Sequence, residues 1–216
     1  MVNEVLDAAE RLVEEERFGA VITVLSGDAI GAKAVVDASG SLLAGGLPDD
    51  LAASAIADAV TLIRAERSKA VEYDAGEVFI EAIAPPPVVV VFGAVDIAQE
   101  LSAHAQRLGF AVIVTDARPA FATDERFPGA TVLRGWPEAV VDDLPSDHRT
   151  HVVVLSHDGR LETPALRWAL GHDVRYIGAM GSRRTHTARL ERLAAEGFDE
   201  ASLDRIHGPV GLDLGA

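Results

Sequence analysis

The sequence of 216 residues contains no cysteine. Disulfide bonds, zinc–thiolate sites, iron–sulfur clusters and thiol nucleophiles are therefore excluded within this chain. No run approaches the ~18 consecutive apolar residues of a membrane-spanning helix. The first residues also lack the basic and apolar regions of a signal peptide. We therefore expect a soluble, cytoplasmic protein with no membrane partner.

Basic residues are scarce: 19 lysines and arginines stand against 34 acidic residues, for a net charge of −15. A general nucleic-acid binder needs a clustered basic surface, so no nucleic-acid partner is expected. Hydrophobic residues make up 49% of the chain and charged residues 25%, which are the proportions of a globular protein. The length allows one domain or two small ones.

Three consecutive prolines, Pro85 to Pro87, divide the chain. They cannot continue a helix or donate hydrogen bonds to a sheet, so they favour an extended segment. We interpret them as the junction between a domain of residues 1–84 and one of residues 85–216; a rigid loop inside a single domain is the alternative. The first part carries 16 acids and 6 bases, and the second carries 18 acids, 13 bases and all seven histidines.

The spacing of apolar residues predicts a small α+β domain in the first part. The expected helices are 3–17 and about 48–65, and the expected strands are 20–25, 34–36, 41–43 and 78–83. The second and third of these strands flank Ala-Ser-Gly, which indicates a hairpin.

The pattern of the second part predicts an α/β fold with a Rossmann-like, parallel, doubly wound sheet. Val88–Phe92 are five consecutive apolar residues, typical of a strand buried on both faces. Further strands are expected at 110–115, 131–133, 151–155 and 174–177. Helices are expected at about 96–108, 137–142, 163–170 and 183–195.

The first of these strands runs into a glycine turn that partly fits a dinucleotide fingerprint. Gly93 occupies the first glycine position and Ala98 the last small position. Val95 stands where the middle glycine would let the backbone approach a pyrophosphate. Asp116, 23 residues after Gly93, could accept hydrogen bonds from a ribose, and Arg118 could pair with a phosphate. NAD(P) is therefore a weaker alternative; the other is an ordinary turn with an exposed acid at the strand end.

Two further loops follow predicted strands at the edge where α/β sheets bind ligands. Residues 156–159 read Ser-His-Asp-Gly, which predicts either a polar ligand-contacting loop or an aspartate helix cap. Neighbouring residues do not make a catalytic triad, and no G-x-S-x-G turn is present. The histidines show no metal-binding spacing such as H-E-x-x-H. No catalytic residue and no metal site is therefore predicted.

The loop after the last predicted strand is basic. Ser182 could cap the next helix, and Arg183 and Arg184 enter its first turn. Residues 175–192 hold five arginines and one acid, Glu191. A helix N-terminus with arginines suits an anion or phosphate. The alternative is a solvated helix face paired with the acidic first domain.

Four separated blocks together resemble the XdhC/CoxI family of accessory proteins for molybdenum hydroxylases, such as xanthine dehydrogenase and aerobic carbon monoxide dehydrogenase. The blocks are VVVVFGAVDIA, VTDARPAFATDERFPGA, VVVLSHDGRLETPAL and the stretch from YIGAMGSRRTHTARL to the end, within residues 76–216. The resemblance implies a small N-terminal domain and a Rossmann-like C-terminal domain.

The resemblance also implies a cofactor chaperone and not a turnover enzyme. Family members bind the molybdenum cofactor, as molybdopterin or its cytosine dinucleotide, and hand it to an apo molybdenum hydroxylase, in some cases with a sulfur donor. We expect the same partners here, together with a homo-oligomer. Candidate cofactor-binding residues are Gly93, Ala94, Asp96, Asp116, Arg118, Ser156, His157, Asp158, Gly178, Gly181, Ser182, Arg183, His186 and His207.

The chain departs from the family pattern at three places. The family turn G-A-G-H is here Gly93-Ala94-Val95-Asp96, and the Ser-Gly-Gly-Cys segment corresponds to residues 44–47, Ala-Gly-Gly-Leu. If that thiol contacts molybdenum or sulfur in relatives, this chain cannot do so. The chain also ends where relatives continue, which suggests a truncated or divergent member. Two rival functions follow: an NAD(P)-binding oxidoreductase, and a ligand-free scaffold that binds a full-length paralogue.

Overall fold

The computed structural model describes residues 2–212, and in them the chain divides into two compact units, one up to Pro85 and one from Pro86. The three prolines lie in an extended segment without regular secondary structure. The expectation that the chain ends where its relatives continue concerns its last residues, which lie outside the described residues. No helix among residues 2–212 is long and apolar enough to cross a membrane.

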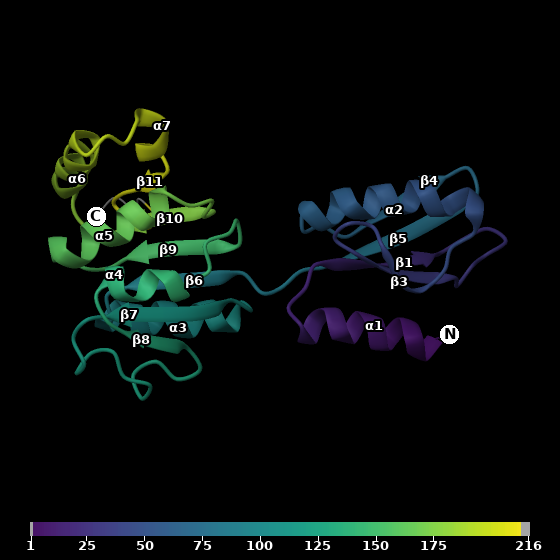
Figure 1. Cartoon of the computed structure of the whole chain (residues 1–216), viewed down its shortest axis with the longest axis horizontal. Helices are drawn as coiled ribbons and strands as arrows, with labels where there is room; N and C mark the ends of the chain where they lie inside the picture. The colour runs from purple at the N-terminus through teal and green to yellow at the C-terminus, as the bar shows by residue number, and fades with distance from the viewer. Residues whose placement is uncertain (1, 213–216) are drawn as a thin grey trace. The chain divides into compact units, whose positions relative to one another are not determined.

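The first unit is an antiparallel sheet between two helices. The strands are β1 (Gly19–Val24), β2 (Lys33–Asp37), β3 (Leu42–Gly45), β4 (Lys69–Tyr73) and β5 (Gly76–Ile83), in the order β3-β2-β1-β5-β4. Helix α1 (Val2–Glu14) and helix α2 (Asp49–Arg64) lie on opposite faces of the sheet (Figure 1). Leu12 packs on one face and Leu51 on the other, and both are almost fully buried.

The second unit is built on a six-stranded parallel sheet in the order β11-β10-β9-β6-β7-β8. The strands are β6 (Val88–Phe92), β7 (Ala111–Asp116), β8 (Thr131–Arg134), β9 (Thr150–Val154), β10 (Tyr176–Ala179) and β11 (Ile206–His207). The first strand in the chain is central and the connections run outward to both edges, as in the dinucleotide-binding Rossmann fold. The predicted α/β fold with a parallel sheet is confirmed.

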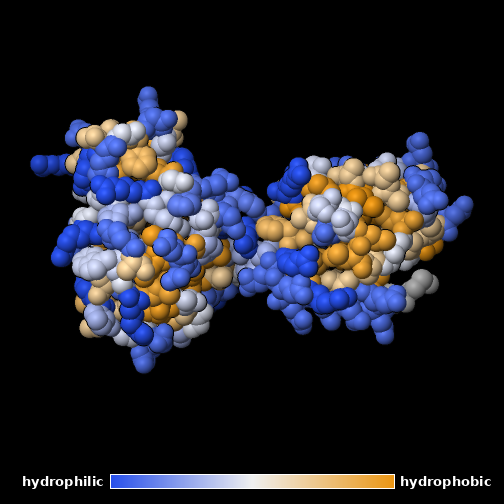
Figure 2. Space-filling view, viewed as in Figure 1, coloured by the Kyte–Doolittle hydropathy of each residue, from blue (hydrophilic) through white to orange (hydrophobic). Residues whose placement is uncertain are grey.

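Helices cover both faces of this sheet. Helix α3 (Asp96–Arg107) packs on one face, where Ala98 and Ala105 are buried. The other face carries α4 (Pro137–Val140), followed by the short 3₁₀ helix η1 (Val141–Asp143), then α5 (Gly159–Leu170) and α6 (Arg183–Ala195). The short helix α7 (Glu200–Leu203) precedes β11. Hydrophilic side chains cover much of each unit, with apolar patches between them (Figure 2).

Three elements differ most from the sequence-based expectation. Strand β4 was not predicted, because its half-exposed KAVEY pattern lacks a continuous apolar run. Helix α5 begins at Gly159, four residues before the expected start, because Asp158 caps it. Pro164 therefore lies inside the helix and not at its start. Proline favours the first helical position, so the pattern placed the start too late. Strand β11 has two residues and pairs with β10, in a stretch for which no strand is predicted.

Candidate functional site

The candidate site lies where β6 and β9 are neighbours in the sheet and their following connections run to opposite edges of it. Such a switch point leaves a crevice outside the carboxyl ends of the strands. Gly93 follows β6 with φ +113°, and a Cβ there would lie 3.2 Å from the carbonyl carbon of Leu155 and 3.3 Å from the nitrogen of Ser156. Only glycine fits this conformation and this close approach.

The next residue ties the turn to the end of β7. The backbone N–H of Ala94 donates to Asp116 Oδ2 at 2.9 Å, and both residues are buried. Arg118 donates three more hydrogen bonds to the Asp116 carboxylate, from its backbone N–H, Nε and Nη2, at 2.7–2.9 Å. Burial alone would raise the pKa of Asp116, but the hydrogen bonds from Arg118 and Ala94 outweigh burial and lower it.

This geometry weakens the case for NAD(P). In dinucleotide-binding proteins the acid at this position receives the ribose hydroxyls. Here four donors of the chain itself already occupy the Asp116 carboxylate. Val95, at the N-cap of α3, replaces the glycine that admits the pyrophosphate. A ribose would have to displace Arg118, and a pyrophosphate would meet the Val95 side chain.

Asp96 carries an exposed charge at the start of α3, and Arg126 balances it. Arg126 Nη2 lies 2.8 Å from Asp96 Oδ1, and Nη1 donates to the carbonyl oxygens of Ala94 and Phe121. The guanidinium of Arg118 lies 4.1 Å from the centre of the Phe121 ring. The loop after β7 therefore holds the glycine turn through Arg126, a residue that the sequence did not single out.

The loop after β9 is a helix cap. Asp158 accepts a hydrogen bond from the Arg160 backbone N–H at 2.9 Å and pairs with its guanidinium at 2.7 Å. Ser156 is nearly buried, and its Oγ accepts from the Asp158 backbone N–H, while His157 is exposed. The aspartate-cap interpretation is therefore confirmed for Asp158. Ser156 and His157 remain at the carboxyl edge, beside the Gly93 turn.

The loop after β10 presents a helix N-terminus. Gly181 has φ +141°, and Ser182 caps α6 by accepting from the Thr185 backbone N–H at 3.1 Å, as predicted. Arg183 and Arg184 occupy the exposed first turn of α6. Gly178 lies inside β10 instead, where a Cβ would come 2.7 Å from the Val210 side chain. Gly178 therefore lets the segment after β11 pack closely against β10.

Arg189 is the largest fully buried side chain of the described residues, and it forms a cluster with Glu162 that the sequence did not reveal. Arg189 donates to both Glu162 oxygens, at 3.1 and 2.9 Å, and to the Met180 carbonyl oxygen at 2.7 Å. Arg192 donates to Glu162 at 2.6 Å. Burial would raise the pKa of Glu162, but the two arginines outweigh burial and lower it.

This cluster reduces the exposed positive charge that the five arginines of residues 175–192 predict. Glu162 on α5 pairs with two of the five arginines, and Arg189 is almost completely buried. Because Arg189 holds the Met180 carbonyl, it fixes the loop that leads to Gly181 and Ser182. The exposed positive charge at the α6 N-terminus therefore comes from Arg183 and Arg184.

The three histidines among the candidate cofactor-binding residues, His157, His186 and His207, lie in different surroundings. His186 is half-buried with Nδ1 3.4 Å from Arg189 Nη1, and burial, followed by the charge of Arg189, lowers its pKa. His207 on β11 is exposed and stacks on the Tyr176 ring at 4.9 Å. No group of residues within 2–212 has the composition and geometry of a metal site.

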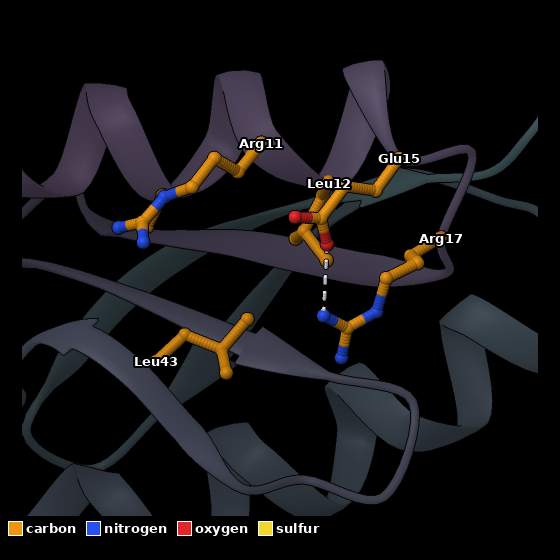
Figure 3. A pocket seen from close by; sticks show the side chains of 6 residues that line it. Arg11, Leu12, Glu15, Arg17 and Leu43 are labelled. Atoms are coloured by element: carbon orange, nitrogen blue, oxygen red, sulfur yellow. Dashed lines mark hydrogen bonds and ion pairs between the residues drawn. The ribbon is translucent and has the colours of Figure 1, made fainter.

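The first unit contributes a separate small pocket between α1 and β3, with a volume of about 130 Å³. Its lining includes Arg11, Leu12, Glu15, Arg17 and Leu43. Arg17 pairs with Glu15 at 3.1 Å (Figure 3).

Leu47, at the position of the family cysteine, packs with the core under α2. That position is structural in this chain.

Comparison with known proteins places the chain in a family. A family model described as the XdhC Rossmann domain matches residues 89–216. A Bacillus subtilis protein named as a probable subunit of xanthine dehydrogenase is 31% identical over 139 residues, which are 64% of this chain and 40% of that protein. The molybdenum cofactor insertion chaperone PaoD of Escherichia coli is 41% identical over 84 residues, 36% of this chain and 26% of PaoD.

These matches span well under half the length of each curated relative. A crystal structure of a xanthine dehydrogenase from Bacillus halodurans matches in fold, with a TM-score of 0.55 over 96% of this chain and 87% of that one, at 17% identity. Because the family model covers more than half of the chain, and because the strand order is that of a Rossmann fold, the protein belongs to the XdhC Rossmann domain family.

Proposed function

We propose that this protein binds the molybdenum cofactor and assists its insertion into a molybdenum hydroxylase of the xanthine dehydrogenase type. The observation that carries the proposal is an XdhC Rossmann domain whose carboxyl edge combines the Gly93 turn with an arginine-bearing helix N-terminus. The similarity to a protein named as a molybdenum cofactor insertion chaperone supports it.

The donors at this edge fit the organic part of the cofactor. The first turn of α6 offers backbone N–H groups, the helix dipole and two arginines, which suit a phosphate. The Gly93 turn and the loop of Ser156 and His157 would contact the pterin, or the nucleotide of a dinucleotide form. When bound, the cofactor would supply the molybdenum–dithiolene redox centre of the partner enzyme.

The chain would hold the cofactor through its organic groups and not through the metal. The sequence has no cysteine, and the half-buried His186 is adjacent to the positive charge of Arg189. His157, His186 and His207 would then act as polar neighbours of the ligand. This arrangement suits a chaperone, because it leaves the coordination positions of the molybdenum available to the accepting hydroxylase.

Replacing Arg183 and Arg184 together with alanine should weaken molybdopterin binding more than tenfold. Two charge-assisted contacts to the phosphate would be lost, and each tenfold change in affinity corresponds to about 1.4 kcal/mol. Equilibrium titration of the purified protein with molybdopterin measures the effect.

The matched control replaces Arg107 and Arg175 with alanine. This removes the same charge at exposed positions by the C-terminus of α3 and the start of β10, the opposite edge of the sheet. It should leave the affinity unchanged. Equal affinities of the wild type and the Arg183/Arg184 variant would refute the phosphate assignment, and no binding by the wild type would refute the cofactor role.

A further inference from the structure

A groove between α4 and α5 contains an exposed tryptophan close to the candidate site. Its lining residues are Trp136, Glu138, Ala139, Arg160 and Pro164, and its volume is about 650 Å³. Ligand pockets for small molecules have volumes of about 300–1,000 Å³. None of the five residues belongs to the phosphate or pterin contacts proposed above.

Trp136 lies in the turn that follows β8. It is the N-cap of α4, Pro137 occupies the first helical position, and a Cβ on Gly135 would lie 2.9 Å from Val140, so the turn is tightly packed. The Trp136 side chain nevertheless remains 40% exposed. A tryptophan side chain has only two rotatable torsions, so it loses little conformational freedom when a ring stacks on it.

Arg160 connects this aromatic face to the switch point. Its guanidinium carbon lies over one face of the Trp136 ring, 4.9 Å from the ring centre, so a stacking ligand would use the other face. Asp158 holds the guanidinium through two hydrogen bonds of 3.1 and 2.7 Å. The hydrogen bonds from Arg160, and to a smaller extent the charge of Arg118, lower the pKa of Asp158. The groove therefore adjoins the loop of Ser156 and His157.

The chemistry of the lining selects a flat, polar ring. An indole face can stack with any type of heteroaromatic ring, because every such ring has a π-face. Glu138 offers carboxylate oxygens to an amino–amide edge, and Arg160 offers donors to a ring carbonyl. A peptide helix would need a row of apolar anchors, and here a single aromatic side chain stands among charged ones.

We propose that the groove of Trp136 and Arg160 binds a planar heteroaromatic ring with an amino–amide edge, of the pterin or nucleobase type. The inference rests on the proposed function, because such rings form both ends of the molybdenum cofactor in its dinucleotide form. It adds a stacking site on α4 and α5 that would fix one ring while the N-terminus of α6 holds the phosphate.

The test uses two ligands that lack phosphate, neopterin and cytidine, titrated by calorimetry into the full chain. Trp136→Ala should weaken binding of the accepted ring at least tenfold, because it removes the stacking face. Trp136→Phe keeps an aromatic face and should stay within about threefold of the wild type. The control is Trp168→Phe, since Trp168 lies on α5 and packs against Phe92 inside the unit; it should leave the affinity unchanged.

The Trp168→Phe protein retains Trp136 as its sole tryptophan, so stacking should also quench its fluorescence. Binding of neopterin alone assigns the groove to the pterin, binding of cytidine alone assigns it to the nucleobase, and binding of both supports the shared ring chemistry. The proposal is overturned if neither ligand binds at millimolar concentration, or if Trp136→Ala binds as well as the wild type. Because neither ligand carries a phosphate, the groove can fail this test while molybdopterin binding through Arg183 and Arg184 stands.

Discussion

Replacing Arg189 with leucine should lower the free energy of unfolding of the second unit by about 3–5 kcal/mol, since removing one partner of a buried ion pair strands the other charge. Arg189 and Glu162 are both almost completely buried, with side chains 1% and 6% exposed. The variant also removes the donor to the Met180 carbonyl oxygen. Urea denaturation followed by tryptophan fluorescence reports this unit, because both tryptophans lie in it.

Arg192 provides the matched control. It pairs with the same carboxylate from a position where 42% of its side chain is exposed. Arg192→Ala should therefore cost less than about 1 kcal/mol. A double variant, Glu162→Leu with Arg189→Leu, should recover part of the loss, because no buried charge is then left unpaired. Equal effects of Arg189→Leu and Arg192→Ala would contradict the structural role given to Arg189.

Gly93→Ala should destabilise the second unit by about 2–3 kcal/mol. A φ of +113° is nearly inaccessible to residues with a Cβ, and such strain costs about 1–3 kcal/mol. The added Cβ would also lie 3.2–3.4 Å from the backbone of Leu155 and Ser156. The shift that relieves this contact would disturb the crevice between β6 and β9, so molybdopterin affinity should fall as well.

Gly159→Ala is the control for this change at the same edge of the sheet. A Cβ on Gly159 meets nothing within 4 Å among the described residues, and its φ is not positive. As the first residue of α5, it should tolerate alanine within about 0.5 kcal/mol. The comparison uses the urea midpoints of both variants. A Gly93→Ala protein as stable as Gly159→Ala would show that the turn is not constrained.

Local sequence patterns predict much of the fold. The five apolar residues of β6 predicted a strand buried on both faces, and all five are buried. The glycine after this strand predicted the turn, and Ser182 predicted the start of α6. Each of these features depends on residues within a few positions of one another, so periodicity and capping rules suffice to find them.

The rest depended on contacts between distant residues. Glu162 and Arg189 are 27 positions apart, and nothing in the sequence distinguishes Arg189 from the exposed Arg183 and Arg184. Asp116 looked like an acceptor for a ribose, because the sequence does not show that Arg118 turns back onto it and that Ala94 donates to it. Such pairing is decided by the packing of strands and helices.

The proposed function is delivery of the molybdenum cofactor to a hydroxylase. The most direct measurement is co-expression with candidate apo-hydroxylases of the xanthine dehydrogenase type, followed by pull-down and cofactor analysis of the complex. We expect that the complex forms, that it contains molybdopterin or its dinucleotide, and that the Arg183/Arg184 double variant loses most of the cofactor. A stable complex without cofactor would contradict the proposed function and indicate a ligand-free scaffold.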